Sequence, residues 1–242
     1  MAGSCSATAR TAPSLPWTSR LKLALAPVMQ RQDRFLGRLL RPLSELTASA
    51  SPRPDATGVR SGDVTIDAST GLWARVFSPI SPLPSSAADD ASSRRPLPVV
   101  VYFHGGGFVC CSAASRLYDA FCRRLCFELG AAVVSVNYRL APRHRFPAAY
   151  DDGVAALRYL DATGGFLPMP PDLAPAVPVD LSSCFLAGDS AGGNIAHHVA
   201  QRWTSTTTSS SSSVVRLAGV VLIQPFFGGE ERTTAELALD GA

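Results

Sequence analysis

Ser190 is the residue of this sequence whose type and surroundings most clearly favour chemistry. The other members of its motif are Gly188, Asp189, Ala191, Gly192 and Gly193. A buried apolar run precedes the motif and a helical pattern follows it, so the turn between them must be tight. Such a turn strains the backbone of the serine and lifts its hydroxyl above the sheet edge, and small neighbours avoid collisions. The start of a helix also favours developing negative charge. This context predicts a nucleophilic serine.

A second motif, His104-Gly105-Gly106-Gly107, follows another buried apolar run. Glycines in such a loop let backbone N–H groups approach a substrate carbonyl oxygen with no side chain between them. Together with the Ala191 N–H, the amides of the three glycines are predicted to hold the oxyanion of a tetrahedral intermediate. One such donor is typically worth about 10²–10³ in turnover. We expect His104 to orient this loop.

The histidines of the sequence do not supply a general base for Ser190. They are His104, His144, His197 and His198. At about 1.5 Å rise per residue, the last two lie roughly 10 Å along the helix that Ser190 opens, which predicts a packing role. His144 lies between arginines in a loop and is not favoured as a base.

The acidic residues offer no catalytic partner either. Asp189 adjoins the serine and must point elsewhere, while Asp151 and Asp152 are typical of the first turn of a helix. The acids that follow Ser190 lack the strand-then-loop context of a catalytic acid. These are Glu230, Glu231, Glu236 and Asp240.

The elements that must position these motifs alternate along the chain. Four continuous apolar runs predict strands buried on both faces, at 99–103, 132–136, 184–187 and 217–223. Helical patterns separate them, at 115–128, 148–160 and 191–203. An antiparallel pair at the sheet edge is predicted at 63–67 and 72–77. The fold class is therefore α/β, with a mostly parallel, doubly wound sheet.

The remaining segments divide the chain. Apolar residues between Trp17 and Leu40 recur at helical spacing and predict an amphipathic helix that acts as a lid. We expect residues 1–48 to form this N-terminal segment and residues 63–242 to form the core. Loops are predicted at 49–62, 78–98, 164–180 and 204–213, which are rich in serine, proline or glycine.

Composition excludes several classes of function. The net charge of +3 is too small and dispersed for nucleic-acid binding, and no apolar run reaches the roughly 18 residues of a membrane span. The six cysteines form no C-x-x-C pair and no zinc-type cluster, so we expect no metal and no cofactor. We expect the protein in the cytoplasm, with the nucleus as the alternative, and no transit peptide.

Several longer motifs resemble one family. HGGGF at 104–108, NYRLAP at 137–142, FPAAYDDG at 146–153 and GDSAGGNIAHH at 188–198 are similar to plant carboxylesterases of the hormone-sensitive-lipase group, which includes the gibberellin receptors. PFFGGEERT at 225–233 and LPWTSRLKL at 15–23 fit the same plant branch. Arg143 departs from the glutamate expected before His144.

The resemblance implies an α/β-hydrolase fold and an ester hydrolase with a Ser-His-Asp triad. It implies Ser190 as nucleophile, and a small-molecule ester or hormone-like ligand. The triad order in this fold is serine, acid, histidine, yet no histidine follows His198. We therefore expect a C-terminally truncated chain, in which the strand at 217–223 is an exposed edge and hydrolysis is weak or absent.

Two alternatives to an esterase stay open. A gibberellin receptor would bind hormone under the N-terminal lid, but receptors characteristically carry serine where this chain has Gly107 and Ala191. A dehydratase related to this family is the third possibility, although its oxyanion loop tends to differ at the last glycine. The oligomeric state does not follow from the sequence.

Overall fold

A computed structural model of the protein describes residues 46–79, 96–169, 176–207, 213–228 and 234. The strands are β1 (Val59–Asp67), β2 (Leu72–Pro79), β3 (Leu97–Phe103), β4 (Ala132–Asn137), β5 (Phe166–Leu167), β6 (Val177–Asp189) and β7 (Leu217–Ile223). The helices are α3 (Arg116–Leu129), α4 (Ala148–Ala162) and α5 (Ala191–Thr207). The expected lid helix and the acids at 230, 231, 236 and 240 lie outside the described residues.

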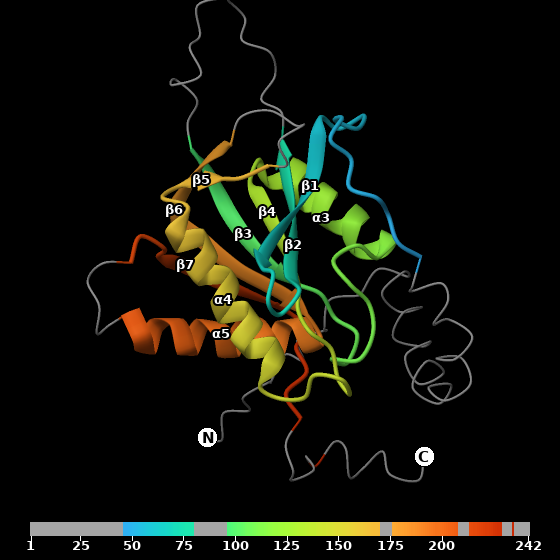
Figure 1. Ribbon diagram of the computed structural model, residues 1–242, viewed down its shortest axis with the longest axis vertical. Helices are drawn as coiled ribbons and strands as arrows, with labels where there is room; N and C mark the ends of the chain where they lie inside the picture. Colours follow the sequence, from blue (N-terminus) through green and yellow to red (C-terminus); the bar gives the residue numbers. More distant parts are fainter. Residues whose placement is uncertain (1–45, 80–95, 170–175, 208–212, 229–233, 235–242) are drawn as a thin grey trace, which may run out of the picture. The chain divides into compact units, whose positions relative to one another are not determined.

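The described strands form one mixed sheet in the order β1-β2-β4-β3-β6-β5, with β7 also paired to β6 (Figure 1). Strands β4, β3, β6 and β7 are parallel, and β1 and β2 form an antiparallel edge. This topology confirms the predicted α/β fold. No helix in the described part of the chain is long and apolar enough to span a membrane.

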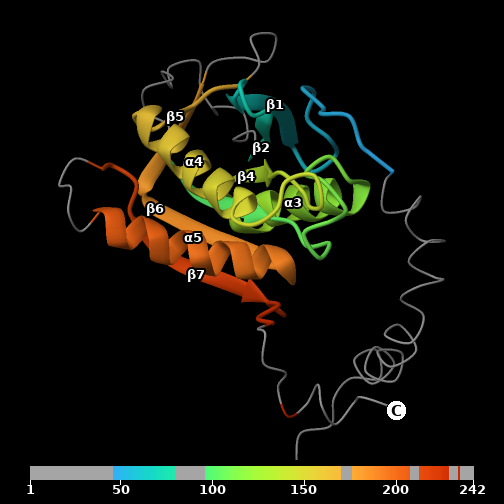
Figure 2. The same ribbon diagram turned by 60° about the horizontal axis from the view of Figure 1, so that its bottom comes forward.

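The helices cover the two faces of the sheet separately. Val99, Val101 and Phe103 of β3 belong to the core that includes residues of α4 and α5, whereas Val100 and Tyr102 pack with α3. Figure 2 shows α4 and α5 running alongside each other over one face. Because both faces are covered, each residue of β3 meets apolar neighbours, which explains its continuous apolar run.

One predicted loop is partly wrong, and the other three lose two to four residues at an end to β1, β2, β3 or α5. Residues 164–180 contain β5 and the first part of β6, which pair antiparallel through Phe166 with Pro178 and Leu167 with Val177. Val177, Val179 and Leu181 are buried and alternate with less buried residues, as expected for a strand. Pro178 lies between two of them, and because proline is typical of loops, the alternating pattern was not recognised as a strand.

Strand β7 forms hydrogen bonds with β6 alone among the described strands. Three of its apolar side chains are substantially exposed, Val220 at 39%, Val221 at 51% and Ile223 at 38%. Within the described ranges, β7 is therefore an apolar edge of the sheet, as the sequence predicted. The prediction that this strand is buried on both faces is wrong, because none of its residues is buried and β6 is its one neighbour among the described strands.

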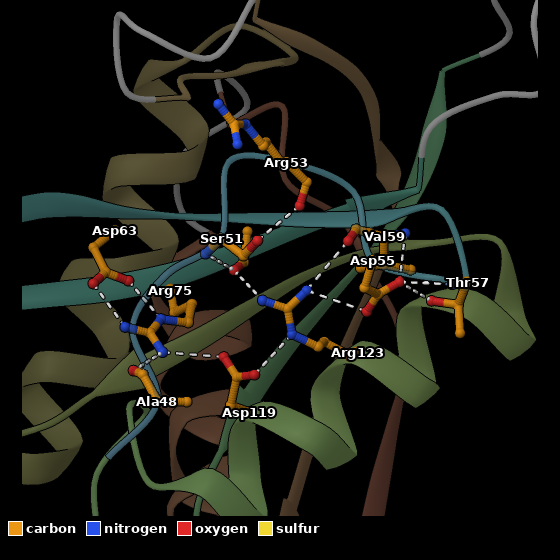
Figure 3. A network of polar contacts seen from close by, with 11 residues as sticks. Ala48, Ser51, Arg53, Asp55, Thr57, Val59, Asp63, Arg75, Asp119 and Arg123 are labelled. Carbon is orange, nitrogen blue, oxygen red and sulfur yellow. Dashed lines mark hydrogen bonds and ion pairs between the residues drawn. The ribbon is translucent and has the colours of Figure 1, made fainter.

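A network of charged groups joins β1, β2 and α3 to the segment that precedes them (Figure 3). The buried Arg75 guanidinium donates to both carboxylate oxygens of Asp63 at 2.6 and 2.8 Å, to Asp119 at 3.0 Å, and to the Ala48 carbonyl at 2.8 Å. Arg123 binds the other Asp119 oxygen at 2.7 Å. The network attaches the segment before β1, at Ala48, to β2 and α3.

Candidate active site

Ser190 lies on the turn between β6 and α5, with its side chain exposed. Its φ is +49°, a left-handed conformation that costs energy for any residue other than glycine. The Ser190 carbonyl accepts hydrogen bonds from the amides of Asn194 at 3.2 Å and Phe226 at 2.9 Å. This is the strained strand-turn-helix geometry that the sequence predicted.

Two glycines make the turn possible. A Cβ on Gly188 would lie 2.3 Å from the Gly192 carbonyl oxygen, and a Cβ on Gly192 would lie 2.0 Å from the Phe103 carbonyl oxygen. Neither contact can be relieved by moving a flexible side chain, because both involve backbone atoms. The glycine spacing around the serine is therefore required by close backbone packing, including packing against the end of β3.

The loop after β3 has an unusual backbone. Gly106 and Gly107 have φ of +118° and +61°, and Phe108 has φ of +64°. The Gly106 carbonyl accepts hydrogen bonds from the amides of Val109 and Cys110, each at 3.1 Å. No hydrogen bond to the Gly106 or Gly107 amide is formed by the described residues. Both amides are therefore available as donors.

The Gly105 amide differs from the other two. It donates to Asp189 Oδ1 at 2.8 Å and to the Tyr118 hydroxyl at 2.9 Å. Asp189 Oδ1 also accepts from the Tyr102 hydroxyl at 2.8 Å, and Oδ2 accepts from the Tyr118 hydroxyl at 2.9 Å. The Gly105 amide, expected as an oxyanion donor, thus joins this loop to the elbow, the turn at Ser190 between β6 and α5.

The same contacts keep the two tyrosines protonated. Burial, and next the Asp189 carboxylate, raise the pKa of Tyr102 and of Tyr118 well above the ordinary value. The hydroxyls therefore remain donors at any physiological pH. Asp189 acts as a structural clamp, and the sequence motif gave no indication of its tyrosine partners.

His104 supports the loop from a fully buried position. Its Nδ1 lies 2.7 Å from the Gly105 carbonyl oxygen, which places the proton on Nδ1. Its ring stacks on Tyr138 at a centroid distance of 4.3 Å, and the Tyr138 hydroxyl donates to the His104 carbonyl at 2.7 Å. Burial lowers the pKa of His104 to about 4, so the ring is neutral near pH 7.

His197 and His198 pack against aromatic rings. His197 contacts Phe227, and His198 contacts Tyr150, each at a centroid distance of 5.2 Å. Burial, then His197 and Arg202, lower the pKa of His198. These contacts agree with the expected packing role of both residues.

The two expected first-turn acids are engaged in ion pairs. Asp152 binds Arg139 at 2.7 Å, and Asp151 binds Arg202 at 2.8 Å. Across the described ranges, no side chain forms a hydrogen bond with the Ser190 hydroxyl, and no cluster of three candidate metal ligands occurs.

Sequence reasoning missed Asn194 and Tyr150. The Tyr150 hydroxyl donates to Asn194 Oδ1 at 2.7 Å, and Asn194 Nδ2 donates to the Phe226 carbonyl at 2.8 Å. Since the Phe226 amide binds the Ser190 carbonyl, Asn194 holds the segment that braces the elbow. One turn into α5, Asn194 could have been suspected from its polarity on a helix that packs on a buried sheet.

A pocket of about 320 Å³ adjoins the glycine loop that follows β3. Its lining comes from that loop, the loop after β4 and the start of α4, and includes Gly107, Phe108, His144, Phe146 and Tyr150. The lining combines aromatic and small apolar residues with the polar side chains of Arg139, His144 and Arg145, and apolar surface with a few polar groups is typical of small-molecule sites. His144 lies in this pocket, which its position between arginines did not predict.

Comparison with known proteins places this geometry among hydrolases. The family model described as alpha/beta hydrolase fold matches residues 100–241. Gibberellin receptor GID1C of Arabidopsis thaliana is 40% identical over 226 residues, covering 92% of this chain and 61% of that protein. Carboxylesterase 20 of the same plant is 40% identical over 207 residues, covering 84% and 59%.

A solved structure gives the same result. The hyperthermophilic esterase from the archaeon Pyrobaculum calidifontis aligns with a TM-score of 0.59 at 30% identity, covering 95% of this chain and 65% of that one. The chain spans about three fifths of the length of the curated relatives it matches.

Proposed function

The chain belongs to the α/β-hydrolase family, and from this premise we propose that Ser190 is the nucleophile of a carboxylic-ester hydrolase. The observation that carries the proposal is the exposed serine at a φ of +49° between β6 and α5. Such strain persists where function requires it and the surroundings enforce it. Plant carboxylesterases and archaeal esterases among the relatives support the reaction class.

In the proposed reaction, the Ser190 oxygen attacks the carbonyl carbon of a small ester. The negative charge that develops on the carbonyl oxygen is stabilised by the amides of Gly106, Gly107 and Ala191. The alcohol leaves with the proton that the serine hydroxyl gives up, and the acyl group stays on Ser190. Water then adds to the acyl carbon, and the acid leaves as the serine hydroxyl is restored. No cofactor is needed, because each step is a nucleophilic substitution at the acyl carbon.

We propose that the 242-residue chain by itself turns over slowly. His104 is buried and bonded to the Gly105 carbonyl, and the other histidines do not contact Ser190 within the described residues. With no base among the described residues the hydroxyl stays protonated, and in serine proteases that lack a triad residue, oxyanion stabilisation and binding leave an acceleration of about 10³–10⁴ over water.

The test combines turnover and labelling. Hydrolysis of p-nitrophenyl acetate and labelling by a fluorescent phosphonate are compared for the wild type, Ser190→Ala and the control Ser182→Ala, an exposed serine on β6. We expect weak turnover and labelling that only Ser190→Ala abolishes. Equal labelling of Ser190→Ala and wild type would exclude Ser190 as the nucleophile.

Hormone binding is the second candidate. It is favoured by relatives that are named gibberellin receptors in Arabidopsis thaliana and in rice, at 40% and 39% identity. Against it stand Gly107 and Ala191, at positions where the receptors characteristically carry serine. Calorimetric titration with a gibberellin distinguishes the two: submillimolar affinity without hydrolysis of any ester would favour the receptor.

A further inference from the structure

Two adjacent cysteines follow the oxyanion glycines directly. Cys110 and Cys111 are both partly exposed, their sulfur atoms lie 3.9 Å apart, and neither forms a disulfide. A vicinal pair of accessible thiols can bind one soft electrophile through both sulfurs, or can be oxidised within the pair. The ester-hydrolase chemistry proposed for Ser190 uses neither thiol.

Cys110 is coupled to the oxyanion loop through Gly106. The Cys110 amide and its Sγ both donate to the Gly106 carbonyl, each at 3.1 Å. The contact is close, since a Cβ on Gly106 would lie 2.2 Å from the Cys110 carbonyl oxygen. Cys111 has a strained φ of +71°. Oxidation of the Cys110 sulfur therefore removes one of the hydrogen bonds that hold the Gly106 carbonyl.

The other cysteines of the described residues have a different environment. Cys122, Cys126 and Cys184 are buried, and burial raises the pKa of each thiol to about 12. Buried thiols in apolar surroundings are inert, because the thiolate is the reactive form. Accessibility thus separates Cys110 and Cys111 from these three.

We propose that Cys110 and Cys111 form a redox-reactive vicinal dithiol that a low-molecular-weight disulfide oxidises to an intrachain disulfide, displacing the Gly106 turn. One thiolate attacks the external disulfide and releases a thiol. The second thiolate then attacks the mixed disulfide, forms the internal S–S bond and releases the second thiol. The two cysteines lose two electrons and two protons, and the external disulfide is reduced.

The proposed disulfide is reversible for a geometric reason. Adjacent Cα atoms are about 3.8 Å apart, whereas disulfides usually join Cα atoms about 4.4–6.8 Å apart. The ring is therefore strained, and strained disulfides are the easily reduced, regulatory ones. In the oxidised state, Cys110 also loses its S–H donor to the Gly106 carbonyl. The consequence for activity rests on the proposed function, but the chemistry of the pair does not.

Phenylarsine oxide tests the pair directly. It condenses with two thiols, forming two As–S bonds and releasing its oxygen as water. We compare binding to the folded full chain by intact-mass spectrometry for the wild type, Cys110→Ser, Cys111→Ser and the double variant Cys122→Ser/Cys126→Ser. Bidentate capture exceeds single-site capture by about 10²–10⁴.

We expect each of the first two variants to weaken binding at least about 100-fold and the buried-pair variant to bind as the wild type does. Undiminished binding in Cys110→Ser or Cys111→Ser would overturn the proposal. So would a wild type that, after treatment with oxidised glutathione, shows no dithiothreitol-reversible loss of two hydrogens in the peptide containing both cysteines.

Hydrogen exchange tests the coupling without relying on hydrolysis. Oxidation of the wild type is expected to speed amide exchange in residues 104–111 and to leave β1 and β2 unchanged. The same treatment of Cys111→Ser serves as the control. Unchanged exchange in residues 104–111 of a chain shown by mass to be oxidised would disprove the displacement. Failure of Ser190 labelling would refute only the proposed function.

Discussion

The Asp189 carboxylate accepts a hydrogen bond of 2.8 Å from the Gly105 amide, across 84 residues of sequence. This contact joins the end of β6 to the end of β3, which are neighbouring parallel strands. The tyrosine hydroxyls of Tyr102 and Tyr118 complete the shell of the carboxylate. The turn at Ser190 and the glycine loop after β3 are thus held as one unit by a residue that neither reacts nor binds substrate in the proposed mechanism.

Asp189→Ala is expected to destabilise the fold considerably more than Tyr118→Phe. The aspartate change leaves the Tyr102 and Tyr118 hydroxyls without their acceptor, at about 1–3 kcal/mol for each unsatisfied group, whereas the Gly105 amide keeps the Tyr118 hydroxyl as a partner. The tyrosine change removes a single hydroxyl. We expect losses of about 3 kcal/mol or more and about 1 kcal/mol, respectively, from urea unfolding. Equal losses would show that Asp189 is not the centre of the clamp.

Ser190→Gly is expected to be more stable than Ser190→Ala. Both variants remove the hydroxyl, but only glycine adopts a φ of +49° without strain. The left-handed conformation costs about 1–2 kcal/mol for other residues, so we expect a difference of about 1 kcal/mol in the free energy of unfolding.

The same pair of changes at Ser182, within β6, provides the control. There glycine should be the less stable of the two, because Ser182 has no left-handed φ and glycine loses more conformational freedom on folding than alanine does. If alanine were the more stable residue at both positions, the strain attributed to the elbow would be absent.

Because His104 is buried as a neutral ring, we expect the free energy of unfolding to fall in acid. Burial lowers its pKa in the folded state to about 4 from an ordinary value of 6.5, so the unfolded chain binds more protons between these values. Stability from the neutral ring is complete above pH 6.5 and falls as the pH drops toward 4, by about 3 kcal/mol in total. Urea unfolding from pH 7 to pH 4 measures it.

His104→Phe should flatten this dependence, since it keeps a ring against Tyr138 and removes the titrating group. His144→Gln, which changes a partly exposed histidine, should keep the wild-type slope. Parallel pH profiles for wild type and His104→Phe would contradict the assignment.

Arg75→Met is expected to destabilise the protein by about 3–5 kcal/mol, the usual effect of removing one partner of a buried ion pair. The Arg75 and Asp119 side chains are only 3% and 8% exposed, so Asp119 would lose one of its two cationic partners inside the protein. The matched control is Arg124→Met on α3, the helix that carries Asp119. The Arg124 and Glu128 side chains of this second pair are 80% and 57% exposed. Exposed pairs contribute about 0–1 kcal/mol. Urea midpoints that shift equally in both variants would contradict a stabilising network.

The sequence by itself determined the order and type of the main elements. Continuous apolar runs and helical periods are local properties of the chain, so strands such as 99–103 and helices such as 148–160 were predicted within a few residues. The position of Ser190 was also local, because a strand, a tight glycine turn and a helix adjoin in sequence. The start of β6 escaped because Pro178 interrupts an otherwise alternating pattern.

Only the tertiary structure decided which groups surround that serine. Gly105 was expected to face a substrate, yet its amide binds Asp189, and Asn194 emerged as the residue that ties Phe226 to the elbow. Hydrogen bonds of this kind join residues tens of positions apart, and their partners depend on which strand ends meet at one edge of the sheet. Local periodicity does not indicate which strand ends lie together, because this depends on the register and packing of segments that are distant in sequence.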